Sequence, residues 1–216
     1  MDTALQRKNM VESQVRPSDV TDRRVIRAML EVPREAFLSE RLRPIAYMDE
    51  SIRLPGGRAL MAPRVLAKLI QHLDLGDADS VLEIGAATGY ATAVLARIAR
   101  SVIAIEADAA LAAEATRALA GAAVSNATLL IGEHARGNPQ HAPYDAILVD
   151  GAVPAVPAEV LDQLKDGGRL VAVIADGRIG RAVQWRRFGG TFDERVLFDA
   201  GAPTLPGFAR KAEFVF

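Results

Sequence analysis

The sequence contains no cysteine, which excludes disulfide bonds, thiolate metal sites and a cysteine nucleophile. Only three histidines are present (His72, His134 and His141), and none is spaced from another as metal ligands are, so we expect no metal site. No uncharged apolar run reaches transmembrane length, and the first ten residues lack the apolar core of a signal peptide. We therefore expect a cytoplasmic protein with no membrane partner.

An excess of charge of one sign is also missing. The 26 lysines and arginines nearly balance the 27 aspartates and glutamates, leaving a net charge of −1. A general nucleic-acid binder would carry a basic excess, so we expect no nucleic-acid partner. Arg181, Arg186 and Arg187 surround Trp185 and could contact RNA, but a solvated edge strand explains them more simply.

The 216 residues, half of them hydrophobic, suffice for a sizeable core. Residues 1–78 read as a helical extension with an active-site loop, packed on a core of residues 79–216. Prolines and glycines in residues 41–63 disfavour long regular elements there. Helices are expected over residues 5–15, over a segment that Asp19 or Thr21 caps and Pro33 closes, and over residues 65–75.

From residue 80 onward, short apolar strands alternate with helices. The expected strands are 80–85, 101–106, 127–132, 145–150 and 169–174, and the expected helices are 88–99, 109–120 and 157–164. This alternation indicates parallel βαβ units buried on both faces. Strand-like stretches at 181–188, 191–198 and 211–216 predict an antiparallel addition at one edge. The expected fold is α/β and Rossmann-like, a mostly parallel sheet with helices on both faces, an antiparallel C-terminal edge and N-terminal helices.

The first of these strands ends in a turn of small residues, GAATG at 85–89, and a helix follows at once. Glycines let a backbone approach a ligand, and a helix N-terminus offers free N–H groups. Glu106 ends the next strand, where a carboxylate can accept hydrogen bonds from both ribose hydroxyls. These features indicate a nucleotide-type cofactor site.

The spacing of the small residues separates two cofactor classes. A dinucleotide fingerprint, G-x-G-x-x-G, needs a small residue at position 90, where the chain has Tyr90. The methyltransferase pattern (D/E)-x-G-x-G-x-G is met by Glu83, Gly85 and Gly89, with Ala87 in the middle position. The sequence thus favours S-adenosylmethionine, with S-adenosylhomocysteine as product.

Further segments follow in a fixed order along the chain: MVESQ at 10–14, VPREAF at 32–37, AYMD at 46–49, APYDAI at 142–147 and QLKDGGRL at 163–170. Together with the turn, they resemble the protein-L-isoaspartate O-methyltransferase family over nearly the whole chain. The resemblance implies a class I methyltransferase fold. It also implies carboxyl methylation of isoaspartyl residues, a protein repair reaction whose partner is a damaged protein or peptide.

The same resemblance implies which residues contact the cofactor. Residues around the turn should line its methionine part, Glu106 should hold the ribose, and Glu133 should face the adenine amino group. His134 stands where the family has a glycine. The implied cofactor-binding residues are Glu83, Gly85, Ala87, Gly89, Tyr90, Glu106, Gly132, Glu133, His134 and Asp150.

The chain departs from the family in the active-site loop, which reads G-x-T-I-S-x-P in the family and GRALMAP at 57–63 here. Ala59 and Met61 replace the two hydroxyl residues, so no catalytic residue is assigned. Met61 could face a substrate or pack in the core, and Arg58 could pair with an acidic acceptor or be solvated. The implied substrate-region residues are Ala59, Leu60, Met61, Ala152 and Val153.

Three hypotheses follow from these residues. The first is an isoaspartyl O-methyltransferase, the second is a same-fold methyltransferase with another acceptor, and the third is a cofactor-binding regulatory protein with little activity. The residues predict no oligomeric state.

Overall fold

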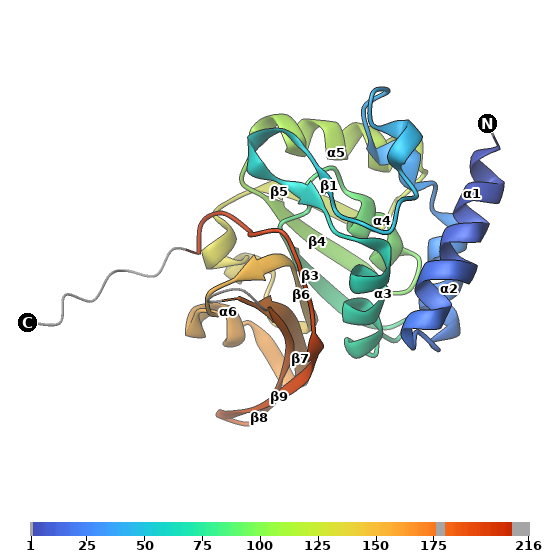
Figure 1. The fold of residues 1–216 in the computed structure, drawn as a ribbon. Helices are drawn as coiled ribbons and strands as arrows, with labels where there is room; N and C mark the ends of the chain where they lie inside the picture. The colour runs from blue at the N-terminus through green and yellow to red at the C-terminus, as the bar shows by residue number, and fades with distance from the viewer. Residues whose placement is uncertain (1, 176–179, 209–216) are drawn as a thin grey trace, which may run out of the picture.

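A computed structural model describes residues 2–175 and 180–208 of the chain. Within these residues a seven-stranded sheet has the order β5-β4-β3-β6-β7-β8-β9 (Figure 1). Its strands are β3 (Ser80–Ile84), β4 (Ser101–Glu106), β5 (Ala127–Ile131), β6 (Tyr144–Val153), β7 (Leu164–Ile174), β8 (Arg181–Phe188) and β9 (Thr191–Asp199). Strands β3 to β7 pair in parallel, whereas β8 and β9 are antiparallel. This confirms the predicted Rossmann-like fold and its antiparallel edge; the predicted strand 211–216 lies outside the described residues.

Helices cover the sheet on both faces. Side chains of a strand point alternately to its two faces, and on the central strand β3 they accordingly enter two different hydrophobic clusters. Val81 of β3 packs in a cluster with the N-terminal helices, whereas Leu82 and Ile84 pack in the opposite cluster, which includes Val160 of α6. Figure 1 shows α3 and α4 between α2 and the sheet. The helices are α1 (Thr3–Met10), α2 (Arg23–Glu31), α3 (Pro63–His72), α4 (Tyr90–Ala96), α5 (Ala109–Gly121) and α6 (Ala158–Leu161).

The N-terminal helices begin at aspartate caps. The Asp2 side chain accepts hydrogen bonds from the first turn of α1, and the Asp22 side chain accepts one from Arg24 N at 2.8 Å. The predicted caps Asp19 and Thr21 are therefore wrong for α2. Asp19 instead adopts a left-handed conformation, with φ 63°, at the end of the preceding turn.

Several helix boundaries differ from prediction, and three of the differences have a plain physical reason. Helix α3 begins two residues early, at Pro63, because proline suits the first turn, where its missing N–H leaves no bond unmade. Helix α4 begins only at Tyr90, because Gly89 before it has φ 91°. Helix α6 is a single turn, and β7 takes over from Leu164.

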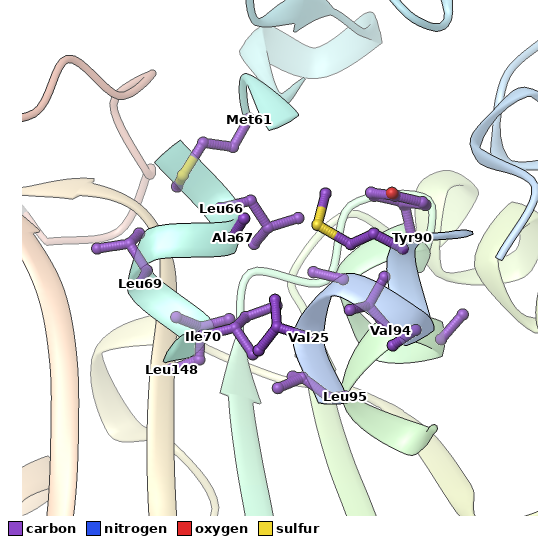
Figure 2. Packing of buried hydrophobic residues seen from close by; sticks show 14 of the residues in the cluster. Val25, Met61, Leu66, Ala67, Leu69, Ile70, Tyr90, Val94, Leu95 and Leu148 are labelled. Atoms are coloured by element: carbon purple, nitrogen blue, oxygen red, sulfur yellow. The ribbon is translucent and has the colours of Figure 1, made fainter. Parts of the chain in front are cut away.

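The loop before α3 contains two short paired strands, β1 (Ile52–Arg53) and β2 (Ala59–Leu60), in the region predicted to be irregular. Met61 follows β2 and is 2% exposed. Figure 2 shows its side chain at the edge of the packed cluster that also contains Leu66 of α3, Val25 of α2 and Tyr90. The structure therefore supports the core-packing alternative for Met61.

Candidate cofactor and acceptor site

The turn after β3 lies against the end of β4. Gly85 N and Ala86 N both donate to the carbonyl oxygen of Ile105, at 2.8 and 3.0 Å. Gly85 has φ 94°, a conformation that side chains disfavour, and a Cβ built on it would lie 2.7 Å from Leu205 Cδ1. Ala87 is also left-handed, with φ 50°, which strains an L-residue by about 1–2 kcal/mol.

Glu106 ends β4 with its carboxylate fully buried beside this turn. Its Oε2 accepts a hydrogen bond from Ala87 N at 2.7 Å, and its Oε1 accepts bonds from Ala107 N and Asp108 N at 2.9 and 3.1 Å. Burial by itself would raise the pKa of Glu106, but the His134 ring, the Arg58 charge and the backbone N–H groups outweigh it and lower the pKa to about 2. The carboxylate is therefore ionised and oriented.

Arg58 is the main side-chain partner of this carboxylate. Its Nε and Nη2 lie 3.3 Å from Glu106 Oε2, and Nη2 also donates to the Gly85 carbonyl oxygen at 2.7 Å. The side chain is 3% exposed, so the reading of Arg58 as a solvated loop residue is wrong. No local pattern indicated this contact, because it joins segments 48 residues apart.

Glu83 and Asp150 lie buried on neighbouring strands, β3 and β6. Among the described residues, no group hydrogen-bonds either carboxylate oxygen of Glu83 or the Oδ1 of Asp150. Burial, with each residue also near another acid, raises the pKa of both carboxyls. The site therefore combines one firmly ionised acid, Glu106, with two buried acids whose pKa values are raised.

The segment after β5 contributes a histidine. His134 is 2% exposed and is therefore a buried residue of the site. Its Nδ1 lies 2.9 Å from the carbonyl oxygen of Pro206, which can only accept, and its Nε2 lies 3.4 Å from Glu106 Oε1. Gly132 N donates to the Glu106 carbonyl at 3.1 Å, and Glu133 is exposed. The structure thus brings Gly132 and His134 to Glu106, whereas Glu133 lies exposed between them.

Sequence reasoning missed the segment 203–208. Pro203 O accepts a hydrogen bond from Ala152 N at 2.7 Å, and Leu205 N donates to Ala152 O at 2.8 Å. Leu205 is 1% exposed and lies close to Gly85 and Gly151. The segment therefore covers the ends of β3 and β6, above the predicted residues Ala152 and Val153, both buried. An apolar Leu205 in a proline- and glycine-rich stretch was the only sequence hint.

Arg34 holds the active-site loop at 57–63 by a hydrogen bond to its backbone. Its Nη2 donates to Met61 O at 2.8 Å, its Nε donates to Ala46 O at 2.9 Å, and its guanidinium carbon lies 4.7 Å from the Tyr90 ring centroid. Ala59 and Leu60 in the same loop are buried. One side chain thus joins three predicted segments, none of whose motifs revealed that contact.

A cavity of about 820 Å³ lies beside this loop. Arg58 and Ala59 line it from the loop, and Pro203 lines it from the C-terminal segment. Further lining residues are Asp49, Arg53 and Arg64. The cavity therefore adjoins both Arg58 and the predicted substrate region. Among the described residues, no group of three or more histidine, aspartate or glutamate side chains is arranged to hold a metal ion.

The chemistry of the residues fits S-adenosylmethionine. An ionised acid ends β4, a left-handed turn with no room for a Cβ at Gly85 follows β3, and a helix begins just beyond it. Arg58 and Leu205 lie on this same surface, so a cofactor and these side chains would compete for it.

The sheet, the turn after β3 and the acid that ends β4 define a class I S-adenosylmethionine-dependent methyltransferase. A family model described as Protein-L-isoaspartate(D-aspartate) O-methyltransferase matches residues 5–197. The chain belongs to this family, as its resemblance predicted, and S-adenosylmethionine is the family's cofactor.

Two relatives match most of the chain. The chain is 38% identical over 214 residues to "Protein-L-isoaspartate O-methyltransferase" of Roseiflexus sp. (strain RS-1), covering 99% of this chain and 98% of that protein. It is 44% identical over 185 residues to "Protein-L-isoaspartate O-methyltransferase 1" of Rhodopseudomonas palustris (strain HaA2), covering 85% and 76%.

Solved structures agree in fold. One named protein-L-isoaspartate O-methyltransferase has a TM-score of 0.81 at 27% identity, covering 93% of this chain and 66% of that one. A putative member from Plasmodium falciparum, in complex with S-adenosyl-L-homocysteine, has a TM-score of 0.80 at 21% identity and covers 92% and 97%. Within residues 2–175 and 180–208, no helix is long and apolar enough to span a membrane.

Proposed function

We propose that the protein transfers a methyl group from S-adenosylmethionine to the carboxylate of isoaspartyl residues in proteins or peptides. The observation that carries this proposal is the family match over residues 5–197. The buried Glu106, held beside the turn by its bond from Ala87 N, supports it.

The proposed cofactor contacts are those that the family resemblance implies, and the geometry around Glu106 supports them. Glu106 accepts hydrogen bonds from the ribose hydroxyls, because its carboxylate is ionised and oriented at the end of β4. The turn at 85–89 and Tyr90 contact the methionine part, and the exposed Glu133 faces the adenine amino group. Glu83 and Asp150 lie beneath the turn as buried acids. S-adenosylmethionine supplies an electrophilic methyl group on its sulfonium sulfur.

The acceptor side needs orientation more than proton transfer. A carboxylate has a pKa of about 4, so it is ionised at neutral pH and needs no general base. The contribution of the chain is to align one carboxylate oxygen with the methyl group. The backbone at Met61, held by Arg34, keeps the loop in place for this alignment.

A second candidate keeps the fold and cofactor but methylates a different acceptor. The observation favouring it is the loop itself, where Ala59 and Met61 replace the family's two hydroxyl residues. Met61 is buried, so its side chain offers the acceptor no polar group. A third candidate is a cofactor-binding regulatory protein with little activity.

The proposal extends to partner and location. The partner is a damaged protein or peptide rather than RNA, since Trp185 is buried and its indole nitrogen donates to Glu194 Oε2 at 2.9 Å. The cysteine-free composition supports a cytoplasmic location.

The test compares two peptides that differ only in one linkage, isoaspartyl against normal aspartyl, by methyl transfer from labelled S-adenosylmethionine. We expect transfer to the isoaspartyl peptide alone. Titration with S-adenosylhomocysteine, followed calorimetrically, measures cofactor binding separately. Binding without transfer to either peptide would favour the other two candidates, and transfer to both peptides would contradict isoaspartyl specificity.

A further inference from the structure

The guanidinium of Arg58 lies where the cofactor is proposed to bind. It donates to the Gly85 carbonyl at 2.7 Å and lies 3.3 Å from Glu106 Oε2. Glu106 is the proposed ribose acid, and Gly85 belongs to the proposed methionine-binding turn. Arg58 therefore offers these acceptors the donors and positive charge that the hydroxyls and ammonium group of the cofactor also carry.

Both sets of donors cannot use these acceptors together. Glu106 Oε2 already accepts hydrogen bonds from Ala87 N and from Nε and Nη2 of Arg58, while Oε1 accepts bonds from Ala107 N and Asp108 N, so neither oxygen has capacity for further donors while Arg58 is in place. A cofactor that takes Oε2 leaves the buried guanidinium without its ionic partner. An unpaired buried charge is strongly unfavourable, so Arg58 must move to another partner or to solvent.

The loop allows such a movement. Gly56 and Gly57 precede Arg58 with φ values of 66° and 72°, and a Cβ built on Gly57 would meet nothing within 4 Å. The adjoining cavity of about 820 Å³ is lined by Arg58 itself and by Ala59. The displaced guanidinium therefore has space to enter on the side of the loop where the acceptor is proposed to bind.

A guanidinium suits the acceptor. It presents planar paired donors that match a carboxylate, and such charge-assisted bonds are both strong and directional. The hydroxyls of the family loop are replaced here by Ala59 and Met61. A carboxylate entering the cavity would otherwise find no side-chain donor at these two loop positions.

We propose that Arg58 is a two-position switch. It pairs with Glu106 until the cofactor takes that carboxylate, and it then turns into the cavity to hold the acceptor carboxylate. The second position rests on the proposed function, since it requires a carboxylate acceptor. The first position requires only cofactor binding.

The test uses Arg58→Met, which keeps the length of the side chain and removes its charge. We expect S-adenosylhomocysteine to bind at least about fivefold more tightly, which corresponds to a wild-type site closed about four-fifths of the time. We expect the KM for the isoaspartyl peptide to rise about tenfold or more, the effect of losing a charged hydrogen bond. Tighter S-adenosylhomocysteine binding together with a higher peptide KM indicates a switch. If Arg58 had only a structural role, its replacement would weaken the binding of both S-adenosylhomocysteine and the peptide.

Two further variants complete the experiment. Arg58→Lys keeps the charge but loses the paired donors. We expect it to bind S-adenosylhomocysteine more tightly than the wild type, by less than Arg58→Met does, and to have a raised KM for the peptide. This variant also replaces Arg58→Met in the experiment if Arg58→Met does not fold. Arg53→Met, an exposed arginine of the same loop, should leave S-adenosylhomocysteine affinity unchanged.

The outcomes test the two proposed positions of Arg58 separately. Weaker or unchanged S-adenosylhomocysteine binding by the Arg58 variants would overturn the switch. Tighter binding with an unchanged peptide KM would overturn the acceptor position. If the wild-type protein methylates no isoaspartyl peptide, the proposed function and the acceptor position both fail, whereas the calorimetric result still decides the first position.

Discussion

Arg34 donates a hydrogen bond of 2.8 Å from its Nη2 to the carbonyl oxygen of Met61, linking the turn that follows α2 to the active-site loop at 57–63. The arginine is fully buried, and its Nε holds the carbonyl of Ala46 in the same way. A side chain 27 positions away thus fixes the backbone at the position where the family has its serine.

Replacing Arg34 with Met should destabilise the protein strongly. Two buried carbonyls lose their donor, and each unsatisfied buried group costs about 1–3 kcal/mol. For a chain of this size each kcal/mol shifts Tm by about 2–4 °C, so we expect a fall of about 5 °C or more by thermal denaturation. Arg34→Lys should fall between this variant and the wild type.

The matched control for Arg34 is Arg41→Met, because Arg41 is exposed. Surface changes of this kind stay within about 0.5 kcal/mol, so its Tm should hardly move. Equal Tm values for the Arg34 and Arg41 variants would refute the anchoring role.

Ala87→Gly should improve the turn. Ala87 adopts φ 50°, so glycine relieves about 1–2 kcal/mol of strain, while its greater freedom in the unfolded chain offsets about 0.4–1 kcal/mol. We expect stability to rise by up to about 1.5 kcal/mol in denaturant unfolding. S-adenosylhomocysteine should also bind more tightly, because the substitution restores the family's middle glycine in the turn that is proposed to contact the methionine part. Ala86→Gly, whose φ is not left-handed, should instead destabilise by about 0.5–1 kcal/mol.

Ionisation of Glu83 should lower the stability of the protein as the pH rises from neutral to mildly alkaline. Burial, with the charge of Asp150 nearby, raises the pKa of Glu83 from its ordinary value of 4.5 to about 8. Its contribution to stability is therefore fully present below pH 4.5 and is lost as the pH rises through 8. Glu83→Gln cannot ionise, so its Tm should fall less than that of the wild type between pH 6 and pH 8.5.

Glu106 should show the opposite pH dependence. Its pKa is lowered from 4.5 to about 2, so its contribution to stability is present above pH 4.5 and is lost as the pH falls towards 2. Glu106→Gln should therefore be less stable than the wild type at pH 7, and the difference should shrink in acid. A constant difference at all pH values would contradict this assignment.

Restoring the family hydroxyls should separate activity from packing. Ala59→Thr places a β-branched residue in strand β2, where it is tolerated, and should raise kcat/KM for the isoaspartyl peptide with little change in Tm. Met61→Ser also removes a core side chain, so we expect a loss of about 2–5 kcal/mol, as for other large-to-small core changes. Activity of the double variant should therefore be measured well below its Tm. If Ala59→Thr has no effect on turnover of the isoaspartyl peptide, the missing hydroxyl at position 59 does not limit this activity.

The sequence by itself determined the sheet and the cofactor turn, because both depend on local patterns. Apolar runs bounded by turn residues located β3 and β4 to within a residue, and the left-handed conformations of Gly85 and Gly89 explain why glycine stands there. The acid at the end of β4 is placed by the strand itself, so Glu106 was predictable in position.

Only the tertiary structure decided what surrounds that acid. Arg58 reaches Glu106 across 48 residues, Leu205 packs on Gly85 from beyond the antiparallel edge, and Pro206 contacts His134 across 72 residues. Burial and ion pairing arise when separate segments converge, and no local periodicity encodes such convergence. For the same reason, a loop arginine that looked solvated proved to be the residue covering the cofactor turn.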